Sequence, residues 1–187
     1  MLVKLKQFST AEAEAAAFGD LENPDLYYQY YPELYQDRRG SLVPWSLRLL
    51  LAELPMYNSK QVAAMNKLFK LRKIVQQMIK NLENNLNADG DVMLDADAEE
   101  RRNIGLEIWR ERERQVLYSL VNCCVLHQDY ESAVKCLELL KQVELQENMS
   151  SLYAAYGRVY LQLGNLSLAD NCFSTAAKVS VKLTADY

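Results

Sequence analysis

Apolar side chains recur at intervals of three and four residues along most of the chain, and this spacing predicts α-helices. Two stretches are unusually long, residues 60–85 and residues 98–126. The first has one apolar stripe, formed by Leu68, Leu71, Val75, Met78 and Leu82. The inner face of the second is expected to carry Ile104, Ile108, Gln115, Val116 and Leu120. These helices predict a long helical hairpin, joined by an acidic loop over residues 85–98.

A shorter periodic stretch, "PWSLRLLLAEL", precedes this hairpin. Pro44 lies near its first turn, where a missing backbone N–H has no cost. Pro55 is expected to end the helix, because proline removes an intrahelical donor. Ser59 is then placed to cap the long helix that follows. The short helix and the hairpin together occupy residues 44–128.

The last third of the chain repeats one arrangement of small and aromatic residues. In "LYAAYGRVYLQLGNLSLADNCFSTAAKV", Gly157 and Tyr160 precede a turn at Gly164. This order is typical of a tetratricopeptide (TPR) helix pair, in which small residues let two antiparallel helices approach closely. The predicted repeat covers residues 150–183. Its second helix carries Ala169, Phe173 and Ala176 at helical spacing.

The same layout occurs 36 residues earlier, in a TPR expected over residues 114–145. Cys124, Ala133 and Leu137 take the places of the tyrosine, alanine and phenylalanine of the later copy. A core position for Cys124 is explained by packing, because reduced cysteine behaves as a small apolar residue.

A partial copy opens the chain, over residues 1–20. "LKQFSTAEAEAAAF" resembles the second helix of a pair, with Phe8 at the turn, followed by Ala11, Ala15 and Phe18. Its first helix is missing, and a lone second helix cannot bury its apolar face. The pattern therefore predicts a chain cut from a longer protein, whose exposed N-terminal end offers a surface for self-association.

Half of the residues are apolar, and only six are Gly and four Pro, which favours a continuous helical core. The expected fold class is all-α: a TPR-like α-solenoid of antiparallel helix pairs with right-handed stacking and one long helical hairpin.

Residues 21–43 lack helical periodicity, and Pro24 and Pro32 break any helix there. We expect an extended, tyrosine-rich connector along neighbouring helices. Its tyrosines either pack within the chain or form a docking strip, since tyrosine joins a large apolar body to a polar tip. The residues concerned are Tyr27, Tyr28, Tyr30 and Tyr31. Ser41, in "RRGS", also matches the short motif of a basophilic kinase site.

Charge and composition exclude several classes of function. The formal net charge of −4 does not favour nucleic acid as a partner. No apolar run reaches the roughly 18 residues of a membrane span. His127 is the only histidine, so neither nucleophilic catalysis nor a metal centre finds support. We predict no enzyme activity, no cofactor and no metal, with the cysteines reduced in a cytosolic protein.

The stretch "NLNADGDVMLDA", residues 85–96, resembles a calcium-binding loop. Oxygen side chains stand at its first, third and fifth positions, and Gly90 at its sixth. The twelfth position, however, is Ala96 instead of a bidentate glutamate, and the first is Asn85 instead of aspartate. A solvated loop and a calcium-regulated helical protein are the two interpretations.

The helix over residues 60–85 gathers cations on one side. Lys70, Lys73 and Lys80 share the face opposite the leucine stripe, with no acid before Glu83. This lysine face is a candidate docking site for an acidic partner surface, or for anionic lipid at a nearby membrane. The alternative is a basic face that only solubilises an acidic protein.

With these elements placed, the chain resembles a known family. "DLYYQYYPELYQDRRGSLVPWSLRLLLAELP", the long helix, the acidic loop and "VLYSLVNCCVLHQDYESAV" are similar to the TPR region of the subunit-twelve family of the transport protein particle (TRAPP) complex. The resemblance covers nearly the whole chain, and the tyrosine-rich connector is its specific part.

This resemblance implies a non-catalytic scaffold whose partners are other subunits of a vesicle-tethering complex. The family's assembly activates Rab GTPases in ER-to-Golgi traffic and autophagy. The implied location is cytoplasmic, peripheral to the ER–Golgi intermediate compartment and the Golgi.

A generic TPR adaptor that binds peptide termini through a carboxylate clamp is the alternative function. Asn122 and Arg158 are its candidate clamp residues. Trp45 and Trp109 are expected to be core anchors.

Overall fold

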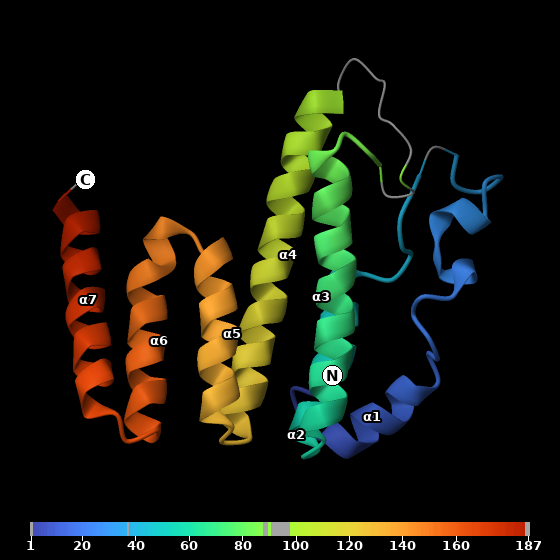
Figure 1. The fold of residues 1–187 in the computed structure, drawn as a ribbon. Coiled ribbons are helices and arrows are strands. Elements are labelled where there is room, and N and C mark those ends of the chain that lie inside the picture. The colour runs from blue at the N-terminus through green and yellow to red at the C-terminus, as the bar shows by residue number, and fades with distance from the viewer. Residues whose placement is uncertain (1, 37, 88–89, 91–97, 186–187) are drawn as a thin grey trace. The chain divides into compact units, whose positions relative to one another are not determined.

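The computed structural model describes residues 2–36, 38–87, 90 and 98–185, and the regular elements in these ranges are all helices (Figure 1). The β-type contact recorded among them is an isolated antiparallel bridge between Tyr27 and Ser41. The predicted all-α fold of helix pairs with one long hairpin is confirmed. By packing, the chain divides into two units, residues 1–112 and 113–187.

Unit 1 holds three helices, the first part of a fourth and two short 3-10 turns. They are α1 (Phe8–Ala16), η1 (Pro24–Leu26), η2 (Tyr28–Tyr30), α2 (Trp45–Tyr57), α3 (Gln61–Glu83) and α4 (Ala98–Leu126), which continues into unit 2. Apolar residues of α2 and α3 form most of the core. They include Ala52, Leu54, Met56, Ala64, Leu68, Leu71 and Val75.

Pro55 does not end α2, contrary to the prediction, but lies buried inside the helix. Proline at this position removes the donor to the carbonyl of Leu51, four residues earlier. The Nζ of Lys67 on α3 lies 3.5 Å from that carbonyl oxygen and donates to it instead. The helix continues two residues past the proline, to Tyr57, and this long contact from Lys67 links the freed carbonyl to α3.

Ser59 is not the cap of α3, which is a second correction. Its φ of 58° places it in the left-handed region, as the turn residue after α2. The N–H groups of Asn58 and Lys60 both donate to the carbonyl of Pro55, which ends the helix. Lys60 then precedes α3 without a side-chain cap.

The apolar stripe of α3 is confirmed, with Leu68 and Val75 fully buried and Met78 half-buried. The α3 end at Leu82 and Glu83 lies against the beginning of α4, so the two helices run antiparallel. They are the long hairpin that the spacing predicts (Figure 1).

The expected inner face of α4 is wrong in its first half. Ile104 is 51% exposed and Ile108 is 46% exposed. Gly105 faces α3 in their place, because a Cβ there would lie 3.2 Å from Leu82. Successive positions on a helix point about 100° apart. The partly buried residues Gly105, Trp109 and Arg112 share one face, which turns Ile104 and Ile108 towards solvent. Farther along, Val116 and Leu120 are fully buried in unit 2.

Unit 2 consists of the rest of α4, a 3-10 turn and three further helices. They are α5 (Tyr130–Val143), η3 (Gln146–Asn148), α6 (Met149–Gln162) and α7 (Leu166–Ala185). Figure 1 shows α5, α6 and α7 as successive antiparallel rods. The core includes Leu117, Cys123, Cys124, Ala133, Leu137, Leu140, Leu152 and Ala169.

The two turns of unit 2 are built alike, 36 residues apart. Gln128 and Gly164 both have left-handed φ, of 59° and 73°. Each is followed by a side chain that caps the next helix: Asp129 accepts from Ser132, and Asn165 from Leu168. Asparagine and aspartate favour this position because their side-chain oxygen satisfies a free N–H of the first turn.

The helices α6 and α7 approach closely where Gly157 meets Phe173. A Cβ at Gly157 would lie 2.6 Å from two atoms of the Phe173 ring, closer than atoms can pack. The Oγ of Ser150 also donates to the carbonyl of Ala176, at 2.9 Å. The phenylalanine ring therefore occupies the space that a side chain at Gly157 would need.

We predict that the effect of Gly157→Ala on the free energy of unfolding changes sign when Phe173 is removed. Gly157→Ala should lower the free energy of unfolding by about 1 kcal/mol, because overpacking against Phe173 outweighs the gain in helix propensity. In a Phe173→Ala background, the same change should raise it by about 0.5–1 kcal/mol, the propensity gain alone. Urea unfolding followed by circular dichroism measures both, and effects of equal sign would contradict the close contact.

Candidate functional site

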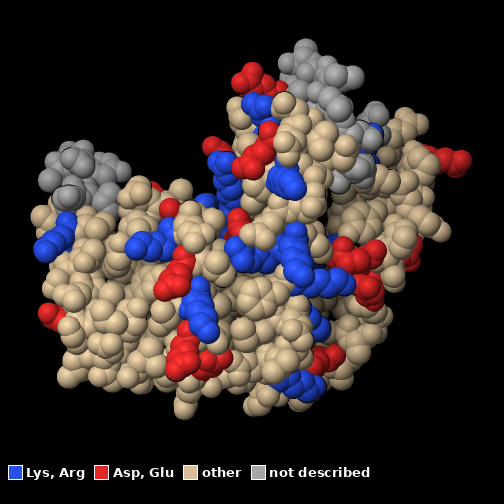
Figure 2. Space-filling view, viewed as in Figure 1, with Lys and Arg blue, Asp and Glu red and all other residues tan. Residues whose placement is uncertain are grey.

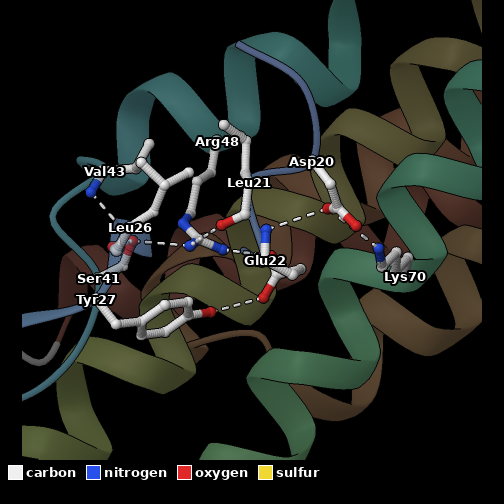
Figure 3. Close-up of polar contacts among 9 residues, drawn as sticks. All are labelled: Asp20, Leu21, Glu22, Leu26, Tyr27, Ser41, Val43, Arg48 and Lys70. Atoms are coloured by element: carbon white, nitrogen blue, oxygen red, sulfur yellow. Dashed lines mark hydrogen bonds and ion pairs between the residues drawn. The ribbon is translucent and has the colours of Figure 1, made fainter. Parts of the chain in front are cut away.

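A buried arginine joins α2 to the loop before it. Arg48 is 8% exposed. Its guanidinium donates to Oε1 of Glu22 at 2.5 Å, to the carbonyl of Leu21 at 2.9 Å and to Oγ of Ser41 at 2.8 Å (Figure 3). Its Nε is buried without a hydrogen-bond partner. A buried charge is costly unless it is paired. These contacts therefore hold α2 to the chain at Leu21 and Glu22 and to the chain at Ser41.

Ser41 closes the loop of residues 21–43, termed the tyrosine loop. Its hydroxyl donates to the carbonyl of Leu26 at 3.4 Å and accepts from the N–H of Val43 at 3.0 Å. The N–H of Leu42 donates to the same Leu26 carbonyl at 2.8 Å. The segment is therefore a closed loop with two 3-10 turns, and not the extended connector that was expected. A kinase site at Ser41 remains a prediction.

Tyr27 belongs to the arginine cluster. Its hydroxyl donates to Oε2 of Glu22 at 2.7 Å, as Figure 3 shows, and the guanidinium of Arg48 lies 5.8 Å from its ring centroid. Burial, together with the hydrogen bond to Glu22, raises the pKa of Tyr27. This tyrosine serves the internal packing of the loop.

The other tyrosines of the loop pack edge to face in two pairs. Tyr28 lies against Tyr35 and Tyr30 against Tyr31, both with ring centroids 5.0 Å apart. Tyr30 is nevertheless 58% exposed, and Leu34 is 75% exposed. The loop thus presents an exposed apolar surface on a scaffold of packed rings.

Residues 8–20, termed the strap, lie across α2 and α3. Glu12 pairs with Lys60 at 3.0 Å, and Asp20 pairs with Lys70 at 3.7 Å. Beneath the strap is a groove of about 350 Å³. Its apolar lining includes Ala15, Ala16, Leu51, Leu71 and Ile74, and Gly19 also borders it.

All three residues of the lysine face are exposed. Lys70 is tied to Asp20 of the strap, in an ion pair whose two side chains are more than half exposed. In the view of Figure 2, Lys and Arg side chains gather over α3 and α4, with Asp and Glu among them. The electrostatic character of this region is therefore mixed and not purely basic.

The two tryptophans are half-buried, less enclosed than core anchors. Trp45 and Trp109 meet edge to face, with ring centroids 6.3 Å apart. The guanidinium of Arg112 lies 4.3 Å from the Trp109 ring centroid and 5.2 Å from that of Trp45. Burial, and then the charge of Arg48, lowers the pKa of Arg112. A cation between two aromatic rings is the favourable arrangement for a partly buried arginine.

The residues that the sequence predicts to pack in the TPR helix pairs differ in how far they are buried. In unit 2, the buried ones are Cys124, Ala133, Leu137, Gly157, Ala169 and Ala176. Tyr160 is half-buried and stacks on Tyr156, whereas Gly164 lies exposed in its turn. Phe173 is 37% exposed, although its ring covers Gly157.

In α1, Ala11 is buried and Ala15 half-buried. Phe18 lies beyond the end of α1 and is 56% exposed, so it does not fill a core position as expected. Phe8 instead supplies the aromatic contact of this helix, stacked on Tyr57 with ring centroids 4.6 Å apart.

The four cysteines are thiols that are not joined in disulfides, and Cys123, Cys124 and Cys136 are buried. Burial raises the pKa of the Cys123 thiol, and a hydrogen bond to Cys136 raises that of Cys124. Such thiols are poor nucleophiles and pack as apolar side chains.

Most of the calcium-like loop, residues 88–89 and 91–97, lies outside the described residues. The described part of the chain contains no group of three or more His, Cys, Asp or Glu arranged to hold a metal. It likewise contains no helix with the length and apolarity needed to span a bilayer. The predicted clamp residues Asn122 and Arg158 are both exposed.

Sequence reasoning missed the cluster of Arg48 and Glu22. The available signal was a lone cation within the apolar helix "WSLRLLLAEL", since a buried arginine requires a partner. The identity of that partner depends on the path of the tyrosine loop, residues 21–43, which periodicity does not reveal. Arg112 was missed as well, although it follows Trp109 by three residues, the spacing of helical neighbours.

Two curated proteins are similar to nearly the whole chain. Trafficking protein particle complex subunit 12 of Mus musculus is 40% identical over 184 residues, which is 98% of this chain and 23% of the relative. The human protein of the same name is 39% identical over 184 residues, 98% of this chain and 24% of the relative. The predicted resemblance to the TRAPP subunit-twelve family is confirmed.

This TRAPP-like chain spans about a quarter of the length of those relatives. No family model matches it. No solved structure matches it either.

We predict that Arg48→Ala opens the tyrosine loop. Removing one member of a buried ion pair leaves Glu22 with the Tyr27 hydroxyl but no cation, and should lower the free energy of unfolding by about 3 kcal/mol. Arg48→Lys should rescue little, because one ammonium cannot reach three separate acceptors. Hydrogen exchange at the amide of Leu42 provides the local measurement. The exposed Arg158→Ala is the matched control, and full protection of Leu42 in Arg48→Ala would refute the role of the cluster.

We also predict that Glu12 makes attachment of the strap pH-dependent. Hydrogen bonds from Lys60 and then Asn58 lower the pKa of Glu12. Its stabilising contribution is complete above the ordinary glutamate pKa of about 4.3 and is lost as the pH falls through the lower folded value. Amide protection in α1, measured by hydrogen exchange, should therefore decrease as the pH is lowered. This decrease should be smaller in Glu12→Gln and unchanged in Glu14→Gln, which alters an exposed residue.

Proposed function

We propose that this chain is a non-catalytic, protein-binding scaffold module of a TRAPP vesicle-tethering complex. The observation that carries this proposal is the 40% identity to a TRAPP subunit across 98% of the chain. Paired helices suit such a role, because they present extended surfaces on which partners bury apolar area.

In this role, the chain holds other subunits of the complex in place. The assembly supports activation of a Rab GTPase in ER-to-Golgi traffic and autophagy. The chain is cytoplasmic and associates peripherally with the ER–Golgi intermediate compartment and the Golgi.

Two exposed surfaces of unit 1 are candidates for subunit contacts. The lysine face offers three exposed ammonium groups to an acidic partner surface. The tyrosine loop offers Tyr30 and Leu34, whose side chains are mostly exposed despite their apolar character. Aromatic side chains on a rigid support are favourable anchors, because little conformational entropy is lost when they bind.

We predict that reversing the charge of the lysine face weakens capture of TRAPP subunits. The chain is expressed with an affinity tag in cells of its source organism, and co-purifying proteins are quantified by mass spectrometry. Changing Lys70, Lys73 and Lys80 together to Glu should lower recovery of at least one subunit about tenfold, because like charges across an interface cost several kcal/mol.

The control is an equal change of charge elsewhere: Lys4, Lys135 and Lys178, all exposed, are changed together to Glu. Recovery unaltered by the first triple variant would remove the lysine face from the interface. Absence of every TRAPP subunit from the unmodified purification would overturn the proposed function itself.

A further inference from the structure

The groove beneath the strap exists because α1 contributes almost no side-chain volume to it. The strap positions that border the groove are Glu12, Ala15, Ala16 and Gly19, which follow the i, i+3, i+4, i+7 spacing of one helical face. The opposite walls carry larger apolar side chains, from Leu51 on α2 to Leu71 and Ile74 on α3. A helix with leucine-sized residues in place of Ala15 and Ala16 would occupy part of this groove of about 350 Å³.

Between Phe8, which stacks on Tyr57, and Asp20, the strap buries little apolar area. Ala11 is the buried residue of α1, and the N-terminus of this nine-residue helix has no side-chain cap. Helices of this length are marginal without tertiary packing. Both side chains of the Asp20–Lys70 pair are more than half exposed, and such pairs contribute roughly 0–1 kcal/mol. Glu12 is 27% exposed and accepts from Asn58 as well as from Lys60, which is 57% exposed. Beyond the strap, the buried pair of Glu22 with Arg48 anchors the chain, and the φ of 63° at Gly19 marks a turn between them.

Charge around the groove is divided by element. Of the charged residues that line it, Glu12 and Asp20 belong to the strap, and Lys67 and Lys70 belong to α3. Glu22 and Arg48 also line it, but they pair with each other. Lys60, next to α3, adds a third cation that Glu12 now pairs. If the strap moved away, the surface beneath would be apolar with a basic border. Its complement is an acidic amphipathic helix, which is the chemistry of the strap itself.

We propose that the strap is a displaceable placeholder, and that the groove binds an acidic amphipathic helix from a partner protein. The partner helix takes the position of residues 8–20, pairs its acids with Lys60, Lys67 and Lys70, and fills the groove with larger apolar side chains. The Glu22–Arg48 pair keeps the displaced segment attached. This inference rests on the proposed protein-binding function and names the surface and the chemistry of one partner.

The test uses a fluorescein-labelled peptide of residues 7–20 that carries Ala15→Leu and Ala16→Leu. Its binding to the purified 187-residue chain is followed by fluorescence anisotropy. The unsubstituted peptide should bind at least about tenfold more weakly, since it buries several fewer methylene groups. On binding, the amides of α1 in the protein should lose protection from hydrogen exchange.

Three variants of the protein make the test specific. Lys67→Glu, in the groove, should weaken peptide binding about fivefold, whereas Lys80→Glu, outside it on the same helix, should not. Ala15→Leu in the protein should raise its melting temperature and weaken peptide binding, because the strap then fills its own groove. Circular dichroism checks the helix content of each variant, and Lys67→Gln replaces Lys67→Glu if the latter loses helix.

Four results would overturn the inference. The first is the absence of saturable binding up to about 1 mM peptide, which is the effective concentration expected of a tethered competitor such as the strap. The second is an equal effect of Lys67→Glu and Lys80→Glu on peptide binding, and the third is retained protection of the α1 amides in the complex. The fourth is a homodimer of the chain that Ala15→Leu abolishes. The last would identify a second copy as the occupant. Because the readout is a defined peptide, its failure is separate from a failure to recover TRAPP subunits from cells.

Discussion

The guanidinium of Arg48 gives the surface of unit 1 its form. A charge that is 92% buried must be surrounded by oxygen atoms, and here these come from Leu21, Glu22 and Ser41. Because these residues lie near the two ends of the tyrosine loop, the Arg48 side chain joins those ends across a segment of about 20 residues. The exposed apolar tip at Tyr30 and the end of the strap both depend on that closure.

Unit 2 is held by a different constraint, the close approach of antiparallel helices. Gly157 receives the ring of Phe173. Ala133 and Ala169, which hold equivalent positions 36 residues apart, are both almost fully buried. Such packing leaves few alternatives in sequence, because a single methyl group is enough to separate the helices. Its turns are similarly restricted, by a left-handed residue followed by a capping side chain.

The two units therefore differ in what they offer a partner. In unit 2, the side chains that match the TPR pattern are mostly used for internal packing. In unit 1, a short strap that includes several alanines lies over larger side chains, and its acids Glu12 and Asp20 pair with Lys60 and Lys70. An element with so little buried area is the one that a competing helix can replace at small cost in free energy. The similarity to a TRAPP subunit gives such a surface a biological setting.

The sequence by itself determined the helices, the 36-residue equivalence in unit 2 and the stripe from Leu68 to Leu82. These features are local: periodicity, small residues and cap chemistry act over a few turns of chain, and each leaves a pattern. The resemblance to the TRAPP family was readable for the same reason, since the tyrosine-rich segment is a contiguous string.

Only the tertiary structure decided where a locally unfavourable residue, such as a proline in a helix or a buried charge, is compensated by a group distant in sequence. Pro55 lies inside a helix whose freed Leu51 carbonyl is approached by Lys67, and Arg48 is buried because a loop brings acceptors to it. Ile104 and Ile108 face outward because α4 meets α3 at Gly105. In each case the deciding atoms are remote in sequence, so no pattern along the chain records the interaction.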